Sequence, residues 1–410
     1  MTTLRYLLLL TLLPATGAAQ QTAAPSDGST LSIALVTMGP GERVWERFGH
    51  NALWVRDSVT GFDRVYNYGM FSFQQEGYVG RFLQGRLLYW MKGFESAPHF
   101  AAYVAADRSL WVQDLNLTPE QLAELADFLA WNDTPENRFY RYDYYLDNCS
   151  TRIRDAIDRV LGGRIHEATA DSASGTTFRF HTQRLTADDV AASTGLLLAL
   201  GPYVDRPISV WEEMFLPLKV REHLRGVTVP DGAGGEVPLV HTEYTLYQST
   251  GAPERDAPPF RAHWYLLAGL LLAGVMMLGG LKSGVPRAAA VASTLVAIVW
   301  VVATGVGGLV LTGLWFFTDH VSAYWNENLF FYNPLALALA ALIPLTLVPV
   351  RWAHRPTAVL AAALGGLTAI GLLLQPLLVQ VNGDLVALAV PPNLALAWLA
   401  LRRVRSTGGG

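Results

Sequence analysis

Long apolar runs dominate the C-terminal part of this chain and limit what it can fold into. Nearly all of the charged residues lie before residue 262. Five apolar runs follow, at about 264–281, 288–312, 334–350, 357–376 and 384–401. Each approaches the length that an α-helix needs to cross a bilayer core of roughly 30 Å. The sequence therefore predicts an all-α membrane domain of about five transmembrane helices over 263–405. Pro344 interrupts the third run, and Pro391 and Pro392 favour a kinked or re-entrant fifth one.

The basic residues between these runs predict an orientation in the membrane. Segments 313–333 and 377–383 contain no Lys or Arg, so we expect them on the outer side. Segments 282–287 and 351–356 and the C-terminal tail are then inside. They carry the basic residues Lys282, Arg287, Arg351, Arg355, Arg402, Arg403 and Arg405. This distribution requires the N-terminal part of the chain to be exported.

The N-terminus predicts export independently. The first twenty residues, MTTLRYLLLLTLLPATGAAQ, place Arg5 before an apolar core at 6–13 and small residues at 17–19. This order is typical of a secretory signal peptide, and the core is too short to span a bilayer. We therefore expect a signal peptide at 1–19 and an exported domain at 20–262.

The exported part has the pattern of an α+β domain. SIALVTM reads as a strand. HNALWVRDS and RVYNYGMF read as the two strands of a hairpin, with a turn at Thr60 and Gly61 between them. In the first, alternate residues fall on opposite faces, Ala52, Trp54 and Arg56 on one and Leu53, Val55 and Asp57 on the other. Residues 118–131 read as a helix, with Thr118 as N-cap and Gln121 completing a capping box. STRIRDAIDRVLGG reads as a second helix that ends at Gly162 and Gly163.

The stretch YLDNCST contains Cys149, the only cysteine in the chain. A lone cysteine is often a small buried apolar residue. Here, however, the predicted helix places Asn148, Cys149 or Ser150 at its N-cap or first turn. A helix N-terminus carries partial positive charge and unpaired N–H groups, which favour a thiolate and can bind an oxyanion. Cys149 is therefore a candidate nucleophile, with Ser150 and Asn148 as candidate contacts for the substrate.

A thiol nucleophile needs a base, and the base needs a group that orients it. His50, in RFGHNALWV, is the candidate base because it lies on a predicted strand. Asn67, on the next predicted strand, is the candidate orienting residue. Each has an ordinary alternative, because a lone histidine is more often structural and a strand asparagine usually lies at a surface or turn.

Other kinds of site are disfavoured. The sequence has no HExxH motif, no paired cysteines and no phosphate-binding loop, so neither a metal nor another cofactor is expected. The net charge is −4 and no basic stripe is present, which disfavours nucleic acid as a partner.

The predicted outer loop GLWFFTDHVSAYWNENLFFYNP is rich in aromatic residues. Its ordinary interpretation is an interfacial aromatic belt. It also brings His320, Asn326 and Asn328 to the side of the exported domain, where they are candidate substrate-binding residues.

Several of these motifs together resemble the Lnb family. RFGHNALWV, VYNYGMFSF, GRLLYWM and YRYDYYLDNCSTRIRD are similar to its N-terminal periplasmic domain, and DHVSAYWNENLFFYNPL is similar to its five-helix segment. The family usually has Thr where this chain has Ser150. The resemblance implies a circularly permuted papain-like domain, of the NlpC-like or LRAT-like kind, in which His50 and Asn67 precede Cys149.

The resemblance also implies a bacterial lipoprotein N-acyltransferase in the inner (cytoplasmic) membrane, with its catalytic domain in the periplasm. A phospholipid would donate an acyl chain to Cys149 as a thioester, and the N-terminal amine of a lipoprotein would accept it. Two alternatives remain. One is a cysteine peptidase or amidase that acts on cell-wall peptide, and the other is a non-catalytic assembly or lipid-binding factor.

Overall fold

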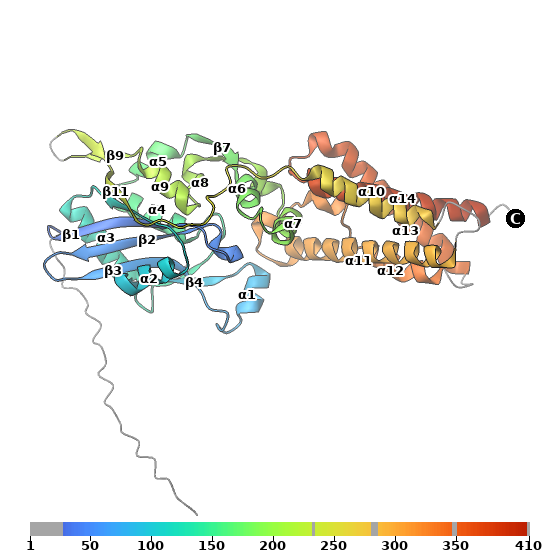
Figure 1. Ribbon diagram of the computed structural model, residues 1–410, viewed down its shortest axis with the longest axis horizontal. Helices are drawn as coiled ribbons and strands as arrows, with labels where there is room; N and C mark the ends of the chain where they lie inside the picture. The colour runs from blue at the N-terminus through green and yellow to red at the C-terminus, as the bar shows by residue number, and fades with distance from the viewer. Residues whose placement is uncertain (1–27, 232–233, 280–285, 347–350, 408–410) are drawn as a thin grey trace, which may run out of the picture.

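The computed structural model describes residues 28–231, 234–279, 286–346 and 351–407, with side chains left out at 351 and 403–407. The predicted signal peptide lies outside the described residues. The chain forms a sheet-rich N-terminal part and a bundle of apolar helices that lies end to end with it (Figure 1). This confirms the α+β class and the helical C-terminal domain.

A seven-stranded antiparallel sheet organises the N-terminal part, in the order β11-β5-β1-β2-β3-β4-β6. The predicted hairpin is confirmed as β2 and β3, whose register pairs Ala52 with Asn67. The strands of this sheet are β1 (Leu31–Met38), β2 (His50–Asp57), β3 (Asp63–Met70), β4 (Leu88–Glu95), β5 (Leu110–Leu115), β6 (Phe139–Arg141) and β11 (Val240–Tyr247).

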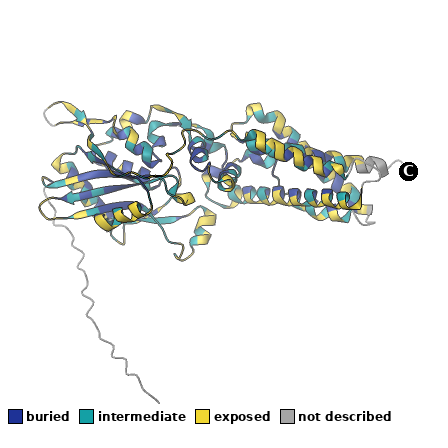
Figure 2. Ribbon diagram, in the orientation of Figure 1, coloured by how far each residue is buried: buried dark blue, intermediate teal, exposed yellow. Residues whose placement is uncertain are grey.

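Alternate residues of the strands pack on opposite faces of the sheet, as the alternation predicted. Ala52 and Val65 pack with Phe100 and Tyr103 of α2 (Ser96–Ala105). Leu53 and other residues of the opposite face join a larger core with α3 (Pro119–Asn132), α4 (Cys149–Val160) and α9 (Pro217–Leu224). Burial is concentrated along these strands (Figure 2).

The capping signals in the sequence correctly located two helices. Thr118 and Gln121 form the predicted capping box of α3. Asn148 caps α4, so Cys149 is the first residue of that helix. After α4 the chain turns at Gly162 and Gly163, whose φ angles of 67° and 91° are left-handed.

Smaller elements complete the N-terminal part. The helices are α1 (Tyr78–Gln84), α5 (Arg164–Thr169), α6 (Phe178–Leu185), α7 (Val190–Ala199) and α8 (Val210–Glu213). The short strands are β7 (Ala173–Thr177) with β8 (Pro207–Ser209), and β9 (Thr228–Pro230) with β10 (Glu236–Pro238).

The C-terminal bundle contains α10 (Ala262–Leu278), α11 (Arg287–Phe317), α12 (Ala336–Leu345), α13 (His354–Leu374) and α14 (Gly383–Thr407). In the described part of the chain, three of them, α11, α13 and α14, are long and apolar enough to cross a membrane. Helices α10 and α12 are apolar but shorter. The bundle therefore associates with a membrane, and a count of five crossings stays a prediction.

The fifth apolar run forms one continuous helix instead of a re-entrant segment. Pro391 and Pro392 lie inside α14 and leave carbonyls of the preceding turn without their usual helical donors. Gly269 of α10 lies directly against the Ala387 and Leu388 carbonyls, where an added Cβ would come within 2.5 Å of the Leu388 oxygen. Close packing of α10 on these carbonyls is one reason why this interrupted helix fits within the bundle.

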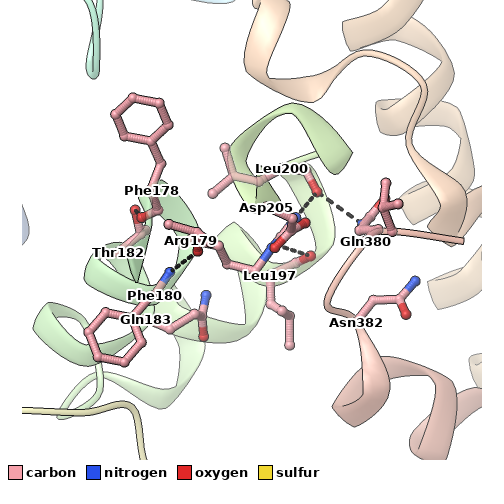
Figure 3. A network of polar contacts seen from close by, with 12 residues as sticks. Phe178, Arg179, Phe180, Thr182, Gln183, Leu197, Leu200, Asp205, Gln380 and Asn382 are labelled. Carbon is pink, nitrogen blue, oxygen red and sulfur yellow. Dashed lines mark hydrogen bonds and ion pairs between the residues drawn. The ribbon is translucent and has the colours of Figure 1, made fainter. Parts of the chain in front are cut away.

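Buried polar contacts join the two parts. Arg179 of α6 pairs with Asp205 at 2.7 Å, and both side chains are almost fully buried. Arg179 also donates to the Leu200 carbonyl, which accepts from Gln380 as well, at 3.0 Å (Figure 3). Gln380 lies between α13 and α14, so this network ties the membrane bundle to the N-terminal part. Such a junction limits how far the two parts can move relative to each other.

Candidate active site

The site is built where β2 begins, β3 ends and α4 begins. His50 is the first residue of β2, and Asn67 follows on β3 just before a register shift in the β3–β4 pairing. The His50 Nε2 and the Asn67 Oδ1 lie 3.1 Å apart. The Asn67 amide also donates to the Val65 carbonyl at 3.2 Å, which fixes the orientation of its oxygen toward the histidine. The structure thus brings these two predicted residues together.

This hydrogen bond determines which imidazole nitrogen remains available. An amide oxygen is an acceptor, so Nε2 must carry the proton and Nδ1 keeps a free lone pair. Burial lowers the pKa of His50 to about 3, and the positive charge of Arg108 adds to that effect, while Asn67 opposes it. His50 is therefore neutral at physiological pH. A neutral imidazole with one free nitrogen can accept a proton.

Cys149 owes its position to the cap formed by Asn148. The Asn148 carboxamide oxygen accepts from the N–H groups of Ser150 and Thr151, at 2.8 and 3.0 Å. Its amide nitrogen donates to the Tyr144 and Phe215 carbonyls. Asn148 and Ser150 are both buried. The Asn148 side chain thus caps the helix. The Ser150 N–H, which the sequence suggested as a donor to an oxyanion, already donates to the Asn148 side chain.

The thiol itself is partly exposed and unpaired with any other cysteine. Its Sγ lies 3.9 Å from the Ser150 hydroxyl oxygen. Burial raises the pKa of the Cys149 thiol above its ordinary value, while the backbone N–H of Asn51 and the Ser150 hydroxyl act against that rise. The backbone N–H groups of Cys149 and Ser150 at the helix N-terminus lower this pKa, as predicted, but the loss of solvation is the larger effect, so the pKa of the thiol is raised overall.

The backbone N–H of Asn51, the residue directly after His50, lies against the Cys149 thiol. Within the described part of the chain, no hydrogen bond joins His50 directly to Cys149. Catalytic hydrogen bonds are often long in the absence of substrate and shorten when it binds. The arrangement therefore provides a protonated thiol with a neutral base nearby, which is the starting state for general-base activation.

Two residues that the sequence did not single out complete the site. Gly69 has a φ of 86°, and a Cβ added there would lie 3.4 Å from the Cys149 Cβ and 3.9 Å from the Tyr140 hydroxyl oxygen. Tyr140 is 7% exposed, and its hydroxyl has no hydrogen-bond partner among the residues that the structure describes. Burial and the nearby Cys149 raise the pKa of Tyr140 well above its usual value, so the phenol stays protonated. The site therefore contains an unused O–H donor close to the thiol.

The residues expected from the outer aromatic loop lie elsewhere. Asn326 and Asn328 are buried at the junction, where their amides donate to backbone carbonyls of α7. Their polar groups hold the two parts together and do not line the Cys149 site. His320 is only partly buried and its Nε2 donates to the Phe82 carbonyl at 2.9 Å. Its ring stacks on Tyr144, four residues before Asn148.

The described ranges contain no group of three or more His, Cys, Asp or Glu side chains placed to hold a metal ion.

Comparison with known families gives two matches. The Lnb N-terminal periplasmic domain matches residues 18–187, which contain His50, Asn67 and Cys149. The Lnb transmembrane domain matches residues 259–388, which contain the bundle up to the first turns of α14. No curated protein and no solved structure matches the chain.

Proposed function

The chain belongs to the Lnb family and is a membrane protein with a periplasmic part, related to lipoprotein maturation, and from this we propose that it is a thiol-dependent acyltransferase. In this proposal a fatty acyl chain moves from a phospholipid, through a thioester on Cys149, to the N-terminal amine of a lipoprotein. The domain containing the thiol lies at the periplasmic face of the bacterial inner membrane.

The observation that carries the proposal is a free thiol at a helix start, against the backbone N–H of Asn51, which directly follows the histidine of a neutral His50–Asn67 pair. The domain that contains these residues is joined to a membrane bundle. This is the arrangement of a cysteine nucleophile with its base and orienting residue. The order His50, Asn67, Cys149 along the chain is what a circularly permuted papain-like fold would give, and we include that fold in the proposal.

In the first half of the reaction, Cys149 Sγ attacks the carbonyl carbon of the phospholipid ester while His50 Nδ1 takes the thiol proton. A C–S bond forms and the carbonyl oxygen becomes an oxyanion. The Tyr140 hydroxyl and the Asn51 N–H are the candidate donors to that oxyanion, because the Ser150 N–H is paired in the helix cap. The C–O bond then breaks, and the glycerol oxygen of the lysophospholipid receives the proton from His50.

In the second half, the lipoprotein amine attacks the thioester carbonyl. A C–N bond forms, the C–S bond breaks, and the amine proton passes by way of His50 to the departing thiolate. The product is an N-acylated lipoprotein, and the free thiol of Cys149 is restored. Asn67 acts throughout as a positioning residue, because it accepts the Nε2–H of His50 and leaves Nδ1 free to take and return the proton.

The membrane bundle fits substrates that cannot leave the bilayer. Each buried CH₂ of an acyl chain is worth about 0.8 kcal/mol, so extracting a long chain into water costs on the order of ten kcal/mol. An enzyme that keeps its thiol beside the membrane avoids most of that cost. A peptidase acting on cell-wall peptide would have no such need for a membrane bundle.

The proposal is tested by Cys149→Ser and His50→Ala in a strain whose lipoprotein N-acylation depends on this protein. Mass spectrometry of lipoprotein N-terminal peptides should show loss of the N-linked acyl chain in both variants. His241→Ala is the matched control, because His241 lies exposed on β11 and outside the site. Retention of the N-acyl group in stably expressed Cys149→Ser protein would refute the thioester. Unchanged lipoproteins with altered cell-wall peptides would favour the peptidase instead.

A further inference from the structure

A short segment at the junction exposes a large apolar surface. We call residues 71–85, which contain α1, the α1 segment. None of the residues of α1 is buried. Phe73, Val79 and Leu83 are 63%, 67% and 61% exposed. Exposed apolar residues are ordinary when scattered, but a contiguous group of this kind usually marks an interaction surface.

The exposed apolar residues of α1 lie side by side on the helix. Val79, Phe82 and Leu83 follow the spacing of three and four residues that places side chains side by side. The inward residue Tyr78 instead stacks on Phe71. Phe82 packs against Tyr78 and His320, whereas Val79 and Leu83 leave most of their surface exposed. The segment is thus a short helix with an exposed apolar surface.

Polar contacts hold the end of α1 beside the exposed, apolar end of α11. Asp319, two residues after α11, pairs with Arg86 and Arg141, each at 2.7 Å. The Asp319 N–H also donates to the Gln84 carbonyl at 2.8 Å, at the end of α1. The last residues of α11, Phe316 and Phe317, are 65% and 81% exposed. Figure 1 shows α1 extending from the sheet toward this end of the bundle.

A second chain of contacts links the segment to the candidate site. Phe71 stacks on Tyr89 at a centroid distance of 5.1 Å, and Tyr89 stacks on Tyr142 at 4.2 Å. Phe71 follows two residues after Gly69, which lies against Cys149. A series of stacked aromatic side chains therefore connects α1 to the neighbourhood of the thiol.

We propose that the α1 segment inserts into the outer leaflet as an interfacial helix, so that the periplasmic domain contacts lipid directly beside its own bundle. The partner is a lipid surface, because the apolar face continues the lipid-facing surface of α11 and aromatic residues favour the membrane interface. Placing α1 in the leaflet buries its apolar face at the level where acyl esters lie. The inference goes beyond the acyl transfer and does not require it.

The test uses the full chain with Cys149→Ser, which contains no cysteine, and adds Val79→Cys or Leu83→Cys. Each variant is labelled with an environment-sensitive NBD fluorophore and reconstituted in nanodiscs of phosphatidylethanolamine and phosphatidylglycerol. A second nanodisc preparation contains lipids with a nitroxide near the carbonyl end of the acyl chain. The matched control is Val59→Cys, because Val59 is 76% exposed in the β2–β3 turn, at the end of the sheet away from the bundle.

We expect the labels at 79 and 83 to emit at shorter wavelength than the label at 59 and to lose most of their emission in nitroxide nanodiscs. The label at 59 should keep its emission. Unquenched labels at 79 and 83 would place α1 in water and overturn the proposal. Because Cys149 is absent from these proteins, the result is independent of the thioester. Failure of acyl transfer would leave a positive quenching result intact.

Discussion

Replacement of Asn67 by Ala tests how the base is held. Asn67 is 1% exposed and accepts the Nε2–H of His50 at 3.1 Å. The alanine variant leaves this N–H unpaired in a partly buried site, which costs about 1–3 kcal/mol. If the correctly oriented imidazole is destabilised by that amount, acylation of Cys149 slows roughly 5- to 150-fold, since about 1.4 kcal/mol corresponds to a factor of ten.

The assay follows intact mass after purified protein is mixed with phospholipid vesicles, and reports the rate at which the acyl adduct on Cys149 appears. Asn116→Ala is the control, because the Asn116 side chain is also bound to a backbone carbonyl but lies outside the site. Both variants should unfold cooperatively in a thermal scan, which separates a slow reaction from loss of fold.

The variant Asn67→Asp distinguishes positioning from a structural role. A carboxylate still accepts from Nε2–H, so acylation at neutral pH should stay within a few-fold of the wild type. Its charge raises the pKa of His50 from the value of about 3 in the wild type. The loss of acylation rate at acidic pH should therefore move to higher pH, where it can be measured. An Asn67→Ala protein that acylates as fast as Asn116→Ala would refute the reasoning.

Two further predictions concern the thiol and its donor. Because the pKa of Cys149 is raised above the ordinary 9.0, its thiolate forms only at alkaline pH. The rate of alkylation by iodoacetamide should therefore rise with pH through a midpoint above that value. An alkylation rate that has already reached its plateau below neutral pH would show a thiolate–imidazolium pair instead. Tyr140→Phe removes a buried hydroxyl for which the described part of the chain offers no hydrogen-bond partner, so stability should not fall. Acylation should nevertheless slow by about 10²–10³-fold if the hydroxyl binds the oxyanion, and an unchanged rate would exclude that role.

Local sequence signals predicted the elements that hold the site. The alternation in HNALWVRD gave β2 and its two faces, and the capping signals gave α3 and the start of α4. These features depend on residues within a few positions of one another, which is why the sequence was sufficient. The pairing of His50 with Asn67 could also be anticipated, because adjacent strands of a hairpin bring such residues together.

The features that the sequence did not predict depend on distant partners. The Tyr140 hydroxyl is significant because β6 brings it against Gly69 and leaves it unpaired. Asn326 and Asn328 belong to the junction because carbonyls of α7, more than 100 residues earlier, accept their amide protons. The pKa of Cys149 follows from burial, which the cap alone did not reveal. In each case the sequence gives the residue, and only the tertiary fold gives its environment.

The most direct test of the central claim is the mass of the purified, full-length protein after incubation with phospholipid and without an amine acceptor. We predict an increase equal to one fatty acyl group, located on Cys149 by peptide mapping and removed by neutral hydroxylamine, which cleaves thioesters. The increase should be absent from Cys149→Ser. An unmodified Cys149 in protein that still N-acylates lipoproteins would contradict the account.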